Sequence, residues 1–139
     1  MIAKAGMAAR TKKPSPPFIG QWRIVEMEQW DQEFIDLEGR GHITFAKGGS
    51  GSFHFGAVEC QLDCCLEESP DGQRVQFSFD GHDEMDPTRG RGWAALKDGE
   101  LHGHLYFHLG DDSSFRAVPV PRSNRTVETD APQASRRSR

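Results

Sequence analysis

Three histidines stand close together in the segment 101–109, and imidazole is both a common metal ligand and a general base. His102 and His104 are two residues apart, so in an extended strand their side chains share one face, about 6.6 Å apart. His108 lies on the same face of that strand. If a neighbouring strand supplied a carboxylate, the first pair could hold one metal ion. The apolar residues that alternate with them are expected to face the interior, which leaves the histidines facing solvent. These apolar residues are Leu101, Leu105, Phe107 and Leu109.

The densest group of ionisable side chains lies between residues 80 and 92. Six residues there are candidates for contact with a partner: His82, Asp83, Glu84, Asp86, Arg89 and Arg91. The segment fails the calcium-loop spacing, because Arg91 stands at the twelfth position from Asp80, where that loop needs an acid. Its length predicts a long loop with turn glycines at Gly90 and Gly92, and long loops are often functional. Its acids could equally pair with its own two arginines.

The sequence contains no nucleophile elbow, phosphate-binding loop, dinucleotide fingerprint or zinc-protease motif. We therefore assign no catalytic residue and no cofactor, and expect binding rather than catalysis. A metal-dependent enzyme that uses His102 and His104 remains the last of three hypotheses.

Charge is unevenly spread along the 139 residues. Residues 18–118 carry 19 acidic and 8 basic side chains, whereas both flanks are basic. An acidic body repels phosphate backbones, so nucleic-acid binding through the folded domain is not expected. We predict a disordered basic leader over 1–17, with Met1 or Met7 as the start, and a disordered basic tail over 119–139.

The three cysteines, Cys60, Cys64 and Cys65, fit neither a disulfide framework nor a metal-binding spacing. If 58–67 is a strand, Cys60 and Cys64 face the core, and Cys65 faces the other side. No apolar run is long enough to span a bilayer, and the N-terminus lacks the apolar core of a secretory signal. These features predict a cytoplasmic protein with no membrane partner.

Apolar and polar residues alternate through most of the domain, which is typical of half-buried antiparallel strands. About eight strands are expected, separated by turn signals such as Asp98-Gly99. A short helix or turn is predicted after the first strand, where Met27, Trp30, Phe34 and Leu37 recur at helical spacing, although 34–37 could equally begin the next strand. The fold prediction is an all-β meander of about eight strands closed into a small barrel, with a two-sheet sandwich as the alternative.

Such a barrel would enclose many aromatic side chains, and these define the first functional hypothesis, a binding module for a small apolar ligand. The candidate ligand-binding residues are Trp22, Phe45, Phe53, Phe55, Phe77, Phe79, Trp93 and Phe107. The weakness of this hypothesis is volume, because side chains alone can fill an eight-stranded barrel. The second hypothesis is a protein-interaction module whose acidic surface and 80–92 segment meet a basic protein.

Gly20-Gln-Trp22, at the start of the first strand, resembles the Gly-x-Trp opening of lipocalin-like barrels, and this resemblance implies a closed barrel. Longer blocks, among them 22–28, 30–37, 83–87, 90–94 and 108–112, are similar to a family of small bacterial proteins of uncharacterised function. That resemblance implies a bacterial cytosolic origin and no particular activity.

Overall fold

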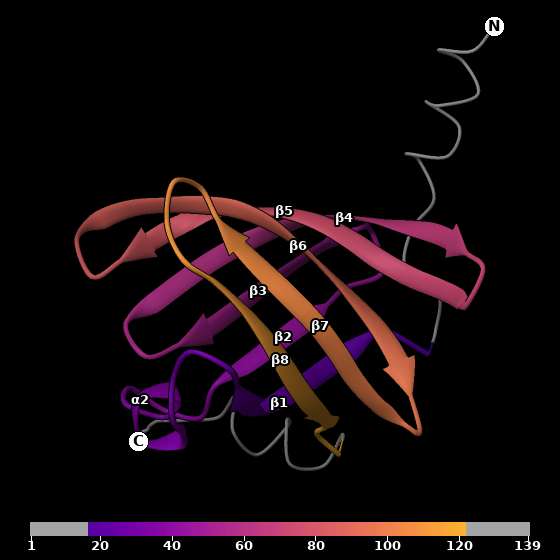
Figure 1. Cartoon of the computed structure of the whole chain (residues 1–139), viewed down its shortest axis with the longest axis horizontal. Coiled ribbons are helices and arrows are strands. Elements are labelled where there is room, and N and C mark those ends of the chain that lie inside the picture. Colours follow the sequence, from indigo (N-terminus) through magenta and orange to yellow (C-terminus); the bar gives the residue numbers. More distant parts are fainter. Residues whose placement is uncertain (1–16, 122–139) are drawn as a thin grey trace, which may run out of the picture.

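The computed structural model describes residues 17–121, which form a closed barrel of eight antiparallel strands in sequence order (Figure 1). The strands are β1 (Gly20–Met27), β2 (His42–Phe45), β3 (Ser50–Phe55), β4 (Val58–Ser69), β5 (Gly72–Asp83), β6 (Asp86–Lys97), β7 (Glu100–Phe107) and β8 (Asp112–Pro119). A short helix, α2 (Gln32–Ile35), follows β1. The expected leader lies outside the described residues except for Pro17, and so does the expected tail beyond Pro121.

Pairing of the first strand with the last closes the barrel. Arg23 of β1 lies opposite Val118 of β8 on one side and opposite His42 of β2 on the other. The predicted eight-stranded barrel with a short helix after the first strand is therefore confirmed, and the sandwich alternative is wrong. Closure satisfies the backbone groups of both strands that would otherwise be sheet edges.

Alternation along β4 places its apolar side chains inside the barrel. Cys60 and Cys64 are buried there, as the strand period predicts, while Cys65 is half-buried on the opposite face. Burial, with nearby carboxylates adding to it, raises the pKa of the Cys60 and Cys64 thiols to about 12. These two cysteines are therefore inert core residues.

The segment 80–92 is not a loop, and this corrects the prediction made from its composition. It forms most of a hairpin in which β5 and β6 pair as far as Asp83 opposite Asp86, with Glu84 turning at a φ of 56°. The inward positions of β6 near this end are Gly90 and Gly92, and they face Phe79 and Phe77 of β5. A strand whose inward residues are glycines shows no apolar alternation, which is why its period was hidden.

Two further expectations about side-chain direction are wrong. Trp93 points out of the barrel, half-buried, where the Arg74 guanidinium lies 4.8 Å from the centre of its ring. Leu109 is 95% exposed, because β7 ends at Phe107 and the chain turns away before it.

The two ends of the barrel are closed differently. At one end Phe18 is buried, and its carbonyl accepts a hydrogen bond of 3.0 Å from the indole N–H of Trp22. The opposite end, which we call the α2 end, consists of the connection 28–41, the turn 56–59, the hairpin tip 80–89 and the loop 108–112. Ile35 of α2 is fully buried there.

Candidate functional site

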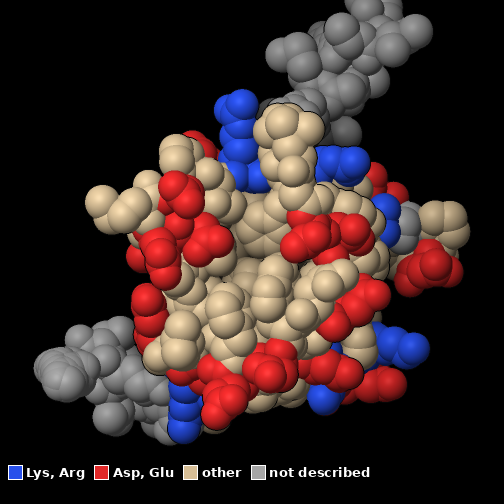
Figure 2. Space-filling model, turned by 60° about the vertical axis from the view of Figure 1, so that its left-hand side comes forward, with Lys and Arg blue, Asp and Glu red and all other residues tan. Residues whose placement is uncertain are grey.

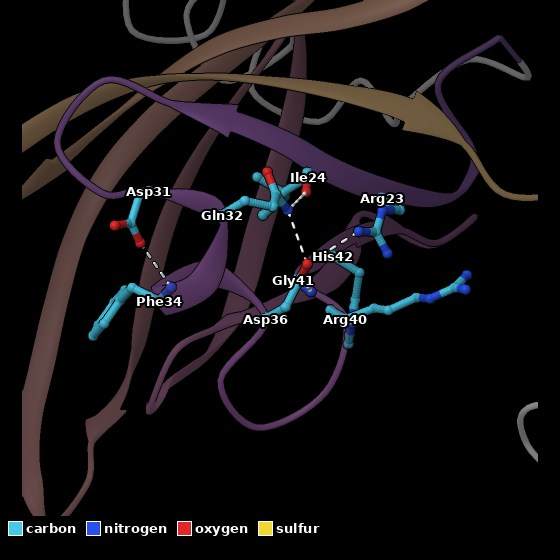
Figure 3. Close-up of polar contacts among 9 residues, drawn as sticks. All are labelled: Arg23, Ile24, Asp31, Gln32, Phe34, Asp36, Arg40, Gly41 and His42. Carbon is cyan, nitrogen blue, oxygen red and sulfur yellow. Dashed lines mark hydrogen bonds and ion pairs between the residues drawn. The ribbon is translucent and has the colours of Figure 1, made fainter.

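The connection between β1 and β2 is held in place by the carboxylate of Asp36 (Figure 3). Its Oδ1 accepts the backbone N–H of Gly41 at 2.9 Å, and its Oδ2 accepts Arg23 Nη2 and Gln32 Nε2, each at 3.0 Å. Burial alone raises the pKa of this carboxyl group, but the hydrogen bonds from Gly41 and Gln32 and the charge of Arg23 outweigh it, so the pKa is lowered. The connection is thus fixed to the barrel wall.

Two hydrogen bonds hold helix α2 in place, one at its start and one to the turn between β3 and β4. Asp31 caps it by accepting the N–H of Phe34 at 2.9 Å. The N–H of Gly56 donates to the carbonyl of Ile35 at 3.0 Å. Gly56 has a φ of 57°, and a Cβ there would lie 2.5 Å from the Phe34 ring, so glycine is needed for both reasons.

Trp30 stands just before this helix and is packed by three phenylalanines. Its ring centre lies 5.1 Å from that of Phe55, and 6.1 Å from those of both Phe34 and Phe107. Such aromatic packing fixes the position of the indole, which remains half-buried and forms one wall of a groove.

The groove has a volume of about 500 Å³ and lies between Trp30, the hairpin tip 80–89 and the loop 108–112. Val58 and Phe107 add apolar surface to it. Its ionisable lining residues are Asp80, Asp83, Asp111, Arg89 and His108. The loop is tied to the hairpin because the N–H of His108 donates to the carbonyl of Arg89 at 2.7 Å. The groove is therefore part of the barrel framework.

Acidic residues are concentrated at the α2 end. Its four segments hold 12 of the 19 acidic residues of the domain but only Arg40 and Arg89 of its 8 basic residues. The acidic ones are Glu28, Asp31, Glu33, Asp36, Glu38, Glu59, Asp80, Asp83, Glu84, Asp86, Asp111 and Asp112. Figure 2 brings this end forward and shows Asp and Glu side chains around a centre of uncharged residues. Nearly all the net negative charge of the domain thus lies at one end of the barrel.

Many of these carboxylates lack a compensating group within residues 17–121. Asp80, Asp83, Glu84, Asp86 and Asp111 make no ion pair there, and neither Arg89 nor Arg91 pairs with them. Away from the α2 end, in contrast, Glu26 and Glu100 share Arg116, and Glu67 binds Arg74. The alternative that the acids of 80–92 pair with Arg89 and Arg91 is therefore not seen among the described residues of the structure.

The same end carries all three of the large hydrophobic side chains that are exposed in the described part of the chain. They are Leu37, Met85 and Leu109, with exposed fractions of 62%, 93% and 95%. Met85 is at the tip of the β5–β6 hairpin and Leu109 is in the β7–β8 loop. The three side chains thus lie at the same end of the barrel as the excess of carboxylates.

The barrel interior is already occupied by the aromatic residues proposed to hold an apolar ligand. Ring centres of Phe53 and Phe79 lie 5.0 Å apart, and those of Phe79 and Phe107 lie 5.1 Å apart. Phe45 and Phe77 approach to 6.0 Å, and all five rings except that of Phe107 are buried. Phe55 and Trp22 are buried too. A ligand in the interior would have to displace these rings.

The three candidate histidines of 102–108 are held apart. His104 Nε2 lies 2.5 Å from Oδ2 of Asp112, and His102 Nε2 lies 3.7 Å from Oε1 of Glu100. His108 follows the end of β7 and lines the groove instead. Within residues 17–121 no three His, Cys, Asp or Glu side chains are grouped so that they could hold a metal ion.

Five of the six residues predicted for partner contact lie in the hairpin tip 80–89, and Arg91 lies beyond it on β6. Asp83, Glu84 and Asp86 lie at the hairpin tip, and Arg89 lines the groove. His82 lies 3.9 Å from Glu59, and Arg91 lies over the ring of Tyr106 at 5.1 Å. The sequence reasoning did not find Trp30, Asp111, Met85 or Leu109 as site residues. Trp30 was marked only by its helical spacing, and Leu109 was expected in the interior.

The fold and site thus define a closed antiparallel barrel with an acidic, partly apolar groove at one end. No protein-family profile, curated protein or solved structure shows a significant match to the chain. None of the helices among residues 17–121 combines the length and the apolar character needed to cross a membrane.

Proposed function

We propose that this protein is a non-catalytic binding module whose α2 end recognises a basic protein. One observation carries the proposal: the excess of carboxylates and the exposed side chains of Leu37, Met85 and Leu109 occupy the same end of the barrel. Carboxylates steer a basic surface toward this end and speed its association. Apolar side chains then add burial, which is the larger contribution to affinity.

A small apolar ligand is the second candidate, and the groove beside Trp30 supports it better than the filled interior does. Trp30, Val58 and Phe107 would contact such a ligand. The resemblance of Gly20-Gln-Trp22 to the opening of lipocalin-like barrels also favours this candidate. In the structure Gly20 begins β1 and Trp22 is buried. We further propose a cytoplasmic location, because the three cysteines are free and thiols stay reduced in that compartment.

The test places a photo-crosslinking amino acid at one of two positions in the full chain, expressed in its source cell. Position 109 is on the α2 end, and position 71 is in the turn between β4 and β5 at the opposite end. We expect crosslinks from position 109 to one or a few proteins that mass spectrometry identifies as basic. Replacing Asp83, Glu84 and Asp86 together by their amides should reduce the yield, because the steering charge is lost.

Similar crosslinks from both positions would contradict the proposal, as would partners that are neutral or acidic. Cells grown without the crosslinker provide the background. A small molecule that co-purifies with the chain and is lost on denaturation in native mass spectrometry would favour the second candidate.

A further inference from the structure

The groove beside Trp30 offers a more specific contact than a diffuse acidic surface, because aromatic and carboxylate groups line the same space. We propose that this groove receives an arginine side chain of the basic partner. This inference rests on the proposed function, since the arginine belongs to the protein that docks on the α2 end. The occupant follows from the charge, the hydrogen-bonding groups and the aromatic wall of the groove.

The charge of the groove favours a cation. Asp80, Asp83 and Asp111 contribute three negative charges and Arg89 one positive charge, with His108 as the remaining ionisable group. None of the three acids has an ion-pair partner within residues 17–121. A cation held among low-dielectric walls interacts with such charges more strongly than one in open water.

The backbone of Pro87, which lines the groove, offers a carbonyl acceptor and no N–H donor. Arg89 directs its carbonyl toward the loop, where it accepts the N–H of His108. Pro87 is two residues earlier on β6, so its backbone groups face the same side, and proline has no N–H. β7 begins its pairing with β6 only at Gly90, so this stretch of β6 is a sheet edge. The Pro87 carbonyl can accept from a donor-rich ligand, and the missing N–H at this position disfavours an added strand.

Arginine fits these features better than lysine or an uncharged side chain. Its guanidinium has five N–H donors and no acceptor, so it can bond two carboxylates and a carbonyl at once. Its planar face can also lie against the indole of Trp30, whose position is fixed by Phe55 and Phe107. Lysine offers a point charge without the planar face, and citrulline has nearly the shape of arginine but no charge.

The test compares three capped pentapeptides that differ only at the central residue, which is arginine, lysine or citrulline, with a leucine on either side. Each is titrated into the full ¹⁵N-labelled chain, and binding is followed by amide and indole chemical shifts. We expect the arginine peptide to bind at least about tenfold more tightly than the citrulline peptide. The shifts should centre on the indole N–H of Trp30 and the amides of Thr88 and Gly110.

Two variants and a matched control connect the binding to the groove. Asp83→Asn and Asp111→Asn should each weaken arginine-peptide binding several-fold while leaving the free protein folded, because both side chains are exposed. Asp71→Asn removes the same charge at the opposite end and should change binding little. Trp30→Leu should reduce the preference for arginine over lysine, with circular dichroism confirming the fold.

Equal binding of the arginine and citrulline peptides would overturn the inference and identify the groove as an apolar site. Shifts centred away from the groove, or equal losses in Asp71→Asn and Asp83→Asn, would also overturn it. These results leave the proposed function standing if position 109 still crosslinks to basic proteins. If that crosslinking fails while the peptide preference holds, the groove binds arginine, and the protein-binding function is what fails.

Discussion

The Asp36 carboxylate accepts the backbone N–H of Gly41 at 2.9 Å and thereby closes the β1–β2 connection into a fixed cover over one end of the barrel. The same carboxylate binds Arg23 on the barrel wall. Because this cover carries Trp30, the contact made by Asp36 helps to determine the shape of the groove. The negative charge of Asp36 thus acts in structure, whereas those of Asp83 and Asp111 remain available to a partner.

Asp36→Asn should lower the free energy of unfolding at pH 7 by about 1–3 kcal/mol, because the amide loses the ion pair and presents a donor to Arg23. The pKa of Asp36 is lowered in the folded state, so its stabilising effect is present above the unfolded-state value of about 3.9 and is lost as the pH falls through the folded-state value. Urea unfolding at pH 7 and pH 3 should show the difference between variant and wild type shrinking with acid. Asp71→Asn is the control, and a difference that stays constant with pH would contradict the assignment.

Gly90→Ala should destabilise the barrel by about 1–3 kcal/mol through overpacking. A Cβ at this position would lie 2.0 Å from the carbonyl oxygen of Tyr106 and 2.6 Å from Cζ of Phe79. Gly48→Ala is a matched control, since a Cβ there meets no atom within 4 Å. Thermal unfolding of both variants checks this, and equal melting temperatures would show that the interior is not filled at Gly90.

Cys65 should react with a thiol reagent well before Cys60 and Cys64 in the native protein. The latter two thiols are buried, and burial raises their pKa to about 12, so almost no thiolate forms at pH 8. Mass spectrometry during labelling should show one fast addition, which Cys65→Ser abolishes. The other two additions should follow only in denaturant, and fast triple labelling of the native protein would contradict the buried placement.

Leu109→Asn should leave the stability within about 0.5 kcal/mol of the wild type, because the side chain is 95% exposed and asparagine tolerates the left-handed backbone at a φ of 57°. The same change should weaken partner binding, since it removes exposed apolar surface from the α2 end. Chemical denaturation measures the first effect. Co-purification of the partner already identified by crosslinking measures the second, because the crosslinker itself would occupy position 109. Met85→Gln tests the neighbouring tip in the same way.

Much of the strand pattern was readable in the sequence. Alternation in 58–67 predicted a strand with the correct inward face, and alternation in 101–109 did so as far as Phe107. Asp98-Gly99 predicted the hairpin between β6 and β7. The burial of Cys60 and Cys64 followed from the same period. Local periodicity predicts these features because a strand with one buried face must repeat every two residues.

Prediction failed where small residues or ends of strands removed that signal. Gly90 and Gly92 are inward residues without side chains, so the first half of β6 looked like a loop. Trp93 lies between two inward small residues and is therefore outward, although its type suggested the core. Leu109 continued the alternation of β7 in the sequence, but the strand had already ended.

The candidate site depended still more on tertiary structure. The sequence by itself determined a strand-rich, acidic domain, because hydrophobic alternation and charge are properties of single residues and their spacing. The alternating direction of the strands puts four distant segments at one end, and closure between β1 and β8 brings the first of these segments beside the last. That arrangement set Trp30, Asp83 and Asp111 around one groove, and no local pattern encodes it because their proximity arises from pairing between strands far apart in the chain.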